Sequence, residues 1–225
     1  MRFSKRKARL SPYKRDVYLA FLVNGARRTQ TDGFPIIEPW MVASDPPKTV
    51  CQWDQRSSAS DPVDTTLCFY CEDSTFQSVL NYPRRYLPTL NLFRNVIGMD
   101  SSPYDNMPLV VQKSQIFLNL ALTYYWGRNG IKVIPNLRIG DPRTLSSLEA
   151  YPKHTLLAVG TSGFMWALNN RNAFRYELQM AIQELQPTGL VVYGTAPDWL
   201  FCFEVIGNIP IFRFDSFLMG RRREK

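Results

Sequence analysis

The sequence predicts an α/β fold, a mostly parallel sheet of about five strands with helices on both faces. Three observations lead to this prediction. Short apolar segments alternate with longer amphipathic ones over residues 94–215, as expected for strands joined by crossover helices. Hydrophobic residues make up 45% of the 225 residues, which excludes disorder as the main state. No apolar stretch approaches the roughly 18 residues that a membrane span requires.

The expected strands are short apolar runs bounded by turn-forming residues. They comprise residues 95–99, 131–137, 155–159, 190–193 and 209–214. Between them, apolar residues at helical spacing and helix-ending Gly or Pro residues predict helices over 109–126, 145–150, 171–185 and 198–206. An open doubly wound sheet and a partial barrel both fit this order.

The chain before residue 94 has a different character. Seven prolines and many Asp and Ser residues predict that residues 16–93 form an irregular, loop-rich region packed on the core. Within it, we expect residues 42–64 to be loop and residues 76–82 to form a short helix that ends at Pro83. The predicted organisation is a basic arm (1–15), this irregular region, an α/β core (94–215) and a basic tail (216–225).

The net charge of +8 is concentrated at the two ends of the chain. Residues 1–15 hold seven positive charges and no acid, and residues 221–225 hold four positive charges and one negative. The ends therefore carry +10, and residues 16–220 carry −2. Basic side chains placed on phosphates release counterions, which predicts non-specific nucleic-acid binding through Lys5, Arg6, Lys7, Arg9, Lys14, Arg15, Arg221, Arg222 and Arg223. The alternative is that both ends are solvated and contact nothing.

Polar side chains follow every expected strand at its carboxyl end, where parallel α/β folds bind ligands. Asp100 and Asp105 could act as acid and base or hold a divalent cation. Because Asp100 is expected in a loop, its replacement by Asn should change stability little. The other polar residues at these strand ends either line a ligand-binding site or are ordinary loop and capping residues. They are Ser101, Asn136, Arg138, Thr161, Ser162, Tyr193, Thr195, Arg213 and Asp215.

The four cysteines indicate a reducing compartment rather than a disulfide scaffold. Cys68 and Cys71 have the spacing of a metal knuckle, and Cys51 could supply a third thiolate to zinc. A second close pair is missing, so a redox dithiol and ordinary reduced cysteines remain as alternatives. The basic start of the chain is followed by no apolar signal region, so we expect no secretory signal.

Several motifs occur together in the second half of the chain. They are Val96-Ile-Gly-Met-Asp100-Ser-Ser-Pro-Tyr-Asp105-Asn-Met-Pro108, Tyr125-Trp126, Gly130-Ile-Lys-Val-Ile-Pro135, Val159-Gly-Thr-Ser-Gly163 and Pro187-Thr-Gly-Leu-Val-Val-Tyr-Gly194. In this order they resemble a bacterial and phage family known as domain of unknown function 4417, over about residues 90–200. A serine replaces the aromatic residue of the family's first motif, and Arg138-Ile-Gly-Asp141 also departs from the family pattern.

The resemblance implies a bacterial or phage mobile-element setting and no established activity. In that setting, the reducing compartment indicated by the cysteines leads us to expect a location in the host cytoplasm. Two functions then compete. One is an accessory protein that associates with nucleic acid through its basic termini. The other is an enzyme that acts on a phosphorylated or nucleotide-like small molecule at the carboxyl ends of the strands. A module that only contacts other proteins is the third expectation.

Overall fold

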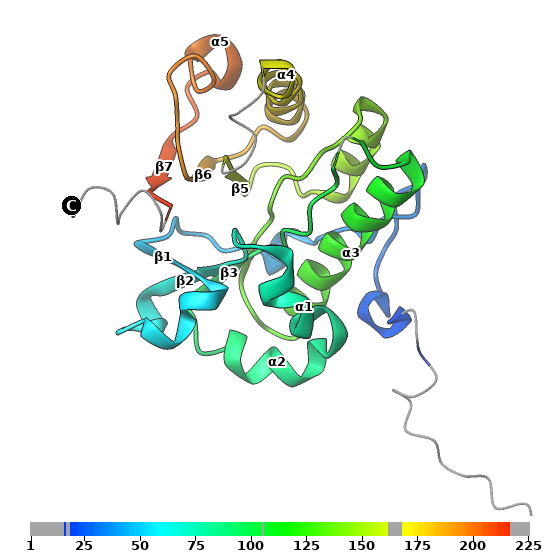
Figure 1. Ribbon diagram of the computed structural model, residues 1–225, viewed down its shortest axis with the longest axis vertical. Coiled ribbons are helices and arrows are strands. Elements are labelled where there is room, and N and C mark those ends of the chain that lie inside the picture. Colours follow the sequence, from blue (N-terminus) through cyan, green and yellow to red (C-terminus); the bar gives the residue numbers. More distant parts are fainter. Residues whose placement is uncertain (1–15, 17–18, 105, 162–167, 217–225) are drawn as a thin grey trace, which may run out of the picture.

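The computed structural model describes residues 16, 19–104, 106–161 and 168–216. It confirms the α/β class: every strand pair is parallel, and the strands form two sheets (Figure 1). The first sheet has the order β1-β2-β3-β4 and the second β5-β6-β7. Their bounds are β1 Thr49–Gln52, β2 Thr65–Cys68, β3 Asn95–Ile97, β4 Val133–Ile134, β5 Leu156–Gly160, β6 Gly189–Tyr193 and β7 Ile211–Phe214.

The two sheets meet just after β4. The amide of Leu137 donates to the carbonyl of Ala158 at 2.8 Å, and the amide of Ala158 donates to the carbonyl of Pro135 at 2.8 Å. Both bonds have parallel-strand geometry around an isolated bridge between Asn136 and Ala158. The spatial order of the strands therefore follows their order in the chain from β1 to β7.

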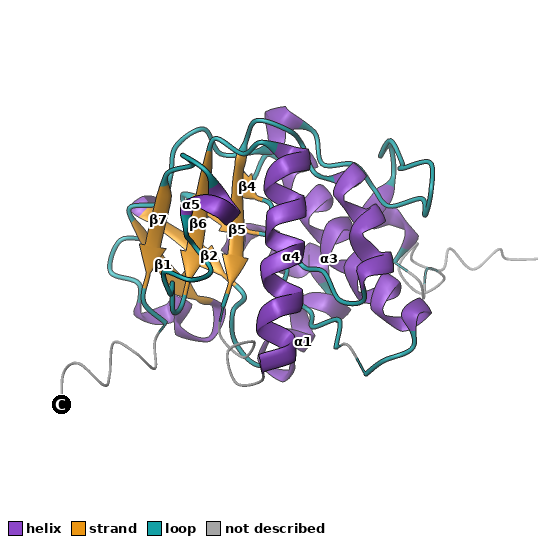
Figure 2. Ribbon diagram, turned by 90° about the horizontal axis from the view of Figure 1, so that it is seen from above, coloured by secondary structure: helices purple, strands orange, loops and turns teal. Residues whose placement is uncertain are grey.

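The array of strands is strongly curved. The ring of Tyr70, just after β2, stacks on Tyr193 at the end of β6, with centroids 5.2 Å apart and planes at 18°. In a flat sheet, four strand spacings would separate these strands by about 19 Å. Stacked rings require the two sheets to curl toward each other, and Figure 2 shows their strands gathered beside α3 and α4. The curvature fits a partial barrel better than a flat open sheet.

The helices of the second half lie within or over their expected ranges, although of the expected helix 198–206 only residues 203–206 are helical. They are α3 Leu109–Arg128, α4 Leu168–Leu185 and α5 Phe203–Ile206, and the expected helix at 145–150 is part of a 3-10 helix, η6 Pro142–Ala150. The Asp141 carboxylate starts η6 by accepting the Arg143 amide at 2.9 Å. No helix in the described part of the chain is both long and apolar enough to cross a membrane.

Two strands lie in the region that was expected to be irregular. Residues 42–64, predicted to be loop, contain β1, and β2 follows directly, so the described part of the chain has seven strands and not about five. β1 is an edge strand with exposed or half-buried side chains, and β2 is fully buried despite two threonines. Neither four-residue strand gives a recognisable apolar pattern, so pairing decides their conformation: β2 pairs with β3, and β1 pairs with β2.

The remaining elements before residue 94 are short helices. The expected helix at 76–82 is α1 Asp73–Asn81, and Pro83, expected only to end it, also begins α2 Pro83–Leu90. Proline suits the first turn of a helix because its missing N–H has no partner there. Among the residues described here there are also the 3-10 helices η2 Ala20–Val23, η3 Pro39–Met41, η4 Trp53–Ser58 and η5 Pro62–Asp64.

A stack of three aromatic rings fixes the point where β2 ends. Phe69 lies between Trp53 and Trp126, with ring centroids 5.4 Å and 5.2 Å away and nearly parallel planes. All three side chains are fully buried. Successive side chains of an extended segment point to opposite faces, so anchoring Phe69 in this layer directs Tyr70 toward the second sheet.

Candidate functional site

The carboxyl ends of β3 and β4 bring three predicted site residues together. Arg138 donates through Nε and Nη2 to both carboxylate oxygens of Asp100. The Nδ2 of Asn136 donates to Asp100 Oδ1 at 2.6 Å. Asp100 is 4% and Arg138 7% exposed. The fold thus places a buried, two-point ion pair at this edge of the sheet.

Burial and charge act in opposite directions on this pair. Burial raises the pKa of the Asp100 carboxyl, and the guanidinium of Arg138 opposes that shift. Burial also disfavours the charge on Arg138, yet the facing carboxylate raises the pKa of the guanidinium. Both oxygens of Asp100 accept hydrogen bonds from Arg138, so in this geometry the carboxylate orients the guanidinium.

Two tyrosines hold Asn136 in place. The hydroxyl of Tyr70 donates to Asn136 Oδ1 at 2.8 Å, and the hydroxyl of Tyr151 donates to the Asn136 carbonyl at 2.9 Å. Burial raises the pKa of both phenols, that of Tyr70 well above its usual value. Both hydroxyls therefore stay protonated as donors, and the amide of Asn136 is left to bond Asp100 and the Met99 carbonyl.

The ends of β5 and β6 form a second group of predicted residues. The hydroxyl of Thr161 donates to the carbonyl of Thr195 at 2.6 Å, and its amide donates to the carbonyl of Tyr193 at 3.0 Å. The stacked rings of Tyr70 and Tyr193 connect this group to Asn136. Only glycine fits at position 160, because a Cβ there would lie 2.5 Å from the Tyr70 ring.

Ser101 is the other predicted residue at this edge. Its amide donates to Asn119 Oδ1 at 2.9 Å, and its carbonyl accepts from Asn119 Nδ2 at 2.8 Å. Its Oγ is buried and has no hydrogen-bond partner among the residues that the structure describes. A buried unpartnered hydroxyl is unfavourable, and this one belongs to the residue that follows Asp100 in the chain.

Several predicted residues are not part of this network. Arg213 and Asp215 are exposed, in β7 and just after it, and the bonds described above do not include them. Asp105 and Ser162 lie outside the described residues. So do the candidate nucleic-acid contacts Lys5, Arg6, Lys7, Arg9, Lys14, Arg15, Arg221, Arg222 and Arg223.

The cysteines considered for zinc are free thiols. Burial raises the pKa of Cys51, that of Cys68 well above its usual value and that of Cys71 to about 11, so all three are protonated at neutral pH in the metal-free protein. Within residues 19–104, 106–161 and 168–216, no three His, Cys, Asp or Glu side chains are grouped so that they could hold a metal ion.

Sequence reasoning missed Tyr70, Tyr151 and Asn119. Tyr70 follows the buried segment Thr65–Phe69, so recognising β2 would have placed it at a strand exit like the other candidates. Tyr151 ends η6 and Asn119 lies within α3. No local signal marks either of these two, because each reaches the strand ends from a neighbouring element.

Comparison with known families supports the resemblance seen in the sequence. The family model described as "Domain of unknown function (DUF4417)" matches residues 32–208, which include β1 to β6 and the Asp100 ion pair. The chain belongs to the DUF4417 family. The match begins well before residue 90, so β1 and β2 are part of the family domain. The family description names no activity.

Two curated relatives of this DUF4417 protein come from phages. The chain is 27% identical to the Gene 1 protein of Mycobacterium phage L5 over 129 residues, which are 57% of this chain and 56% of the relative. It is 26% identical to the Gene 1 protein of Mycobacterium phage D29 over 129 residues, which are 57% of this chain and 48% of that relative. The match thus spans about half of each phage protein. No solved structure matches the chain.

Proposed function

We propose that this DUF4417 protein is a phage or mobile-element accessory protein that associates with nucleic acid through its basic termini. The observation that carries the proposal is the charge partition, +10 at the two ends against −2 over residues 16–220. Relatives encoded by phages support the setting. Phosphate contacts require no base-reading motif, so the proposed binding is independent of sequence.

The ion pairs of the body support placing the phosphate contacts at the ends. Many of the Lys and Arg side chains in the body form ion pairs with carboxylates, in buried or in exposed positions. A paired cation contributes less to the attraction of a polyanion than an unpaired one. These pairs are Arg27–Glu38, Lys48–Asp64, Arg94–Asp64, Lys113–Asp32, Arg138–Asp100, Arg143–Asp141 and Lys153–Glu184. Affinity for a polyanion should therefore come mainly from residues 1–15 and 221–225.

The test compares the full chain with a variant in which the basic residues of 1–15 and 221–225 are changed to Gln. Fluorescence anisotropy with a random duplex should give, for the full chain, a log affinity that falls linearly with log salt, with a slope of roughly −4 to −7. The Gln variant should lose nearly all binding at moderate salt. A matched control, Arg28→Gln with Arg85→Gln, changes two exposed body cations and should bind almost as the parent does. Equal binding by parent and Gln variant would refute the proposal.

A second candidate is an enzyme that acts on a phosphorylated or nucleotide-like small molecule at the carboxyl ends of the strands. The observation in its favour is the buried network of Asp100, Asn136 and Arg138, together with the unpartnered hydroxyl of Ser101. A guanidinium oriented by a carboxylate suits the binding of a phosphate. Ser101→Ala keeps the packing and the ion pair, so it tests this site without disturbing the fold.

The measurement for the second candidate is thermal stability with added nucleotides or sugar phosphates. A ligand that binds only the native state raises the melting temperature, and at a given concentration a tighter ligand raises it further. The parent should be stabilised, and Ser101→Ala should be stabilised less while melting at nearly the same temperature without ligand. If the same compounds stabilise both proteins equally, the carboxyl-edge site is refuted for these ligands.

A further inference from the structure

The described part of the chain starts and finishes at opposite ends of the body. In Figure 1 it starts in the blue segment to the right of α3 and finishes after β7 on the left. Figure 2, viewed from above, again places β7 on the left with α3 to its right. The basic segments 1–15 and 221–225, with seven and four positive charges, are therefore attached to opposite ends of the body.

Side-chain contacts fix the point where the first basic segment joins the body. The carboxylate of Asp16 accepts hydrogen bonds from the amides of Ala20 and Phe21 at 2.8 and 2.9 Å, which ties residue 16 to η2. The Phe21 ring packs edge-on against Tyr125 in α3, with centroids 5.4 Å apart. The Cζ of Arg84 in α2 lies 4.1 Å from the centre of the same ring. The first basic segment thus starts from a position held by α2 and α3.

The strand β7 fixes the point where the second basic segment leaves the body. It pairs with β6 along its whole length, and the amide of Gly194 donates to the Phe214 carbonyl at 2.8 Å. Arg221 is the seventh residue after Phe214, so it lies at most about 25 Å of extended chain from it. A folded body of this size is roughly 40 Å across. The first cations of the second segment therefore act on phosphates at the β7 end of the body.

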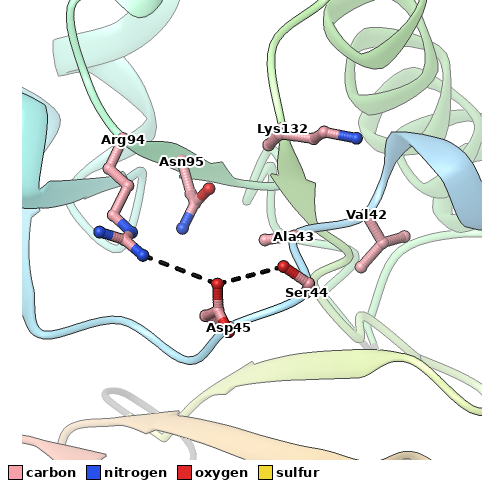
Figure 3. Close-up of a pocket in the computed structure, with 7 residues that line it drawn as sticks. All are labelled: Val42, Ala43, Ser44, Asp45, Arg94, Asn95 and Lys132. Atoms are coloured by element: carbon pink, nitrogen blue, oxygen red, sulfur yellow. Dashed lines mark hydrogen bonds and ion pairs between the residues drawn. The ribbon is translucent and has the colours of Figure 1, made fainter.

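The body between these two points contributes little attraction for phosphate. Residues 16–220 carry a net charge of −2. In the polar pocket where β3 and β4 begin (Figure 3), the Arg94 guanidinium lies 3.7 Å from the Asp45 carboxylate. The Lys132 ammonium of the same pocket donates to the Trp40 carbonyl at 2.7 Å. A duplex that ran along the body from one basic segment to the other would therefore gain few phosphate contacts on the way.

We propose that the protein bridges two nucleic-acid duplexes, one bound by residues 1–15 and the other by residues 221–225. The inference rests on the proposed function, because both basic segments must contact phosphates. It adds that they contact different duplexes, since they are attached to opposite ends of a body that is roughly 40 Å across. At such a separation the charges of the two duplexes are screened from each other, because the Debye length is about 8 Å at physiological ionic strength.

The test is the co-capture of two duplexes by the full chain. The protein is mixed with a biotin-labelled duplex and a fluorescent duplex, and the fluorescence retained on streptavidin beads is measured. Two variants change the basic residues of a single segment to Gln, in residues 1–15 or in residues 221–225. Each variant should still bind duplex in fluorescence anisotropy at low salt but retain only the background seen without protein. The control Arg28→Gln with Arg85→Gln, which changes two exposed body cations, should retain as much as the parent.

A mixture of the two single-segment variants distinguishes bridging by one chain from association between chains. The mixture should stay at background, because each copy then holds one duplex. Bridging is overturned if the parent binds duplex in anisotropy but retains no second duplex, if a single-segment variant retains as much as the parent, or if the mixture restores retention. In these cases the proposed function still stands. A parent that binds no duplex in anisotropy would refute the proposed function and bridging together.

Discussion

Replacing Asp100 by Asn should destabilise the protein strongly. Asp100 and Arg138 are 4% and 7% exposed, and the guanidinium donates to both carboxylate oxygens. Arginine cannot lose its proton, so the variant keeps a buried cation without its counter-charge. Breaking a buried ion pair in this way costs about 3–5 kcal/mol, a large part of the roughly 5–15 kcal/mol by which domains are stable. The small effect expected for a loop aspartate is thus corrected by the burial of this residue.

Urea unfolding followed by tryptophan fluorescence measures this loss. Trp53 and Trp126 are fully buried reporters. With a slope of about 3 kcal/mol per molar urea, the midpoint should fall by about 1 M or more. Adding Arg138→Met to Asp100→Asn should recover part of the loss, because the unpaired cation is removed. The control Glu184→Gln breaks an exposed pair and should change stability by less than about 1 kcal/mol.

The single variant Arg138→Met adds a pH dependence with a defined sign. It leaves a buried carboxyl at Asp100, and burial raises the pKa of that group. The folded variant then holds a proton that the unfolded chain releases, so its stability should fall as the pH rises through the folded pKa. The variant should therefore be closest to the parent at acidic pH.

The account of a charged buried pair is refuted if the free energy of unfolding of the Asp100→Asn variant lies within about 1 kcal/mol of that of the parent.

Three further predictions concern other buried groups. Glu177 in α4 is 5% exposed, and burial raises its pKa from 4.5 to about 8. The folded state keeps this proton, so the free energy of unfolding, measured from pH 4.5 to pH 8, should fall by up to about 1.4 kcal/mol per pH unit. The Glu177→Gln variant should lack this slope. Gly160→Ala drives a methyl into the Tyr70 ring and should cost about 2 kcal/mol in urea unfolding, less when combined with Tyr70→Leu. Tyr70→Phe removes the hydroxyl bonded to Asn136 and should lower the free energy of unfolding by about 1 kcal/mol. An unchanged stability in thermal denaturation would contradict this hydrogen bond.

The α/β class could be predicted because the chain from residue 94 alternates short apolar runs with helical ones. The five strands expected there are all present, and the helices differ from their expected ranges mainly at the ends. That part of the fold depends on the spacing of apolar residues along the chain, which can be read directly from consecutive residues. β1 and β2 could not be predicted, because two four-residue strands rich in threonine and flanked by prolines acquire their structure from pairing, β2 with β3 and β1 with β2.

The sequence also determined that the ends of the chain are basic and the body nearly neutral, since formal charge needs no coordinates. It placed Asp100, Asn136 and Arg138 at strand exits, because the carboxyl ends of parallel strands lie at one edge. Only the tertiary structure decided that Asp100 is bound by Arg138 and that Tyr70 meets Tyr193. The physical reason is that side-chain direction depends on strand register and sheet curvature, and both are set by packing between segments far apart in the chain.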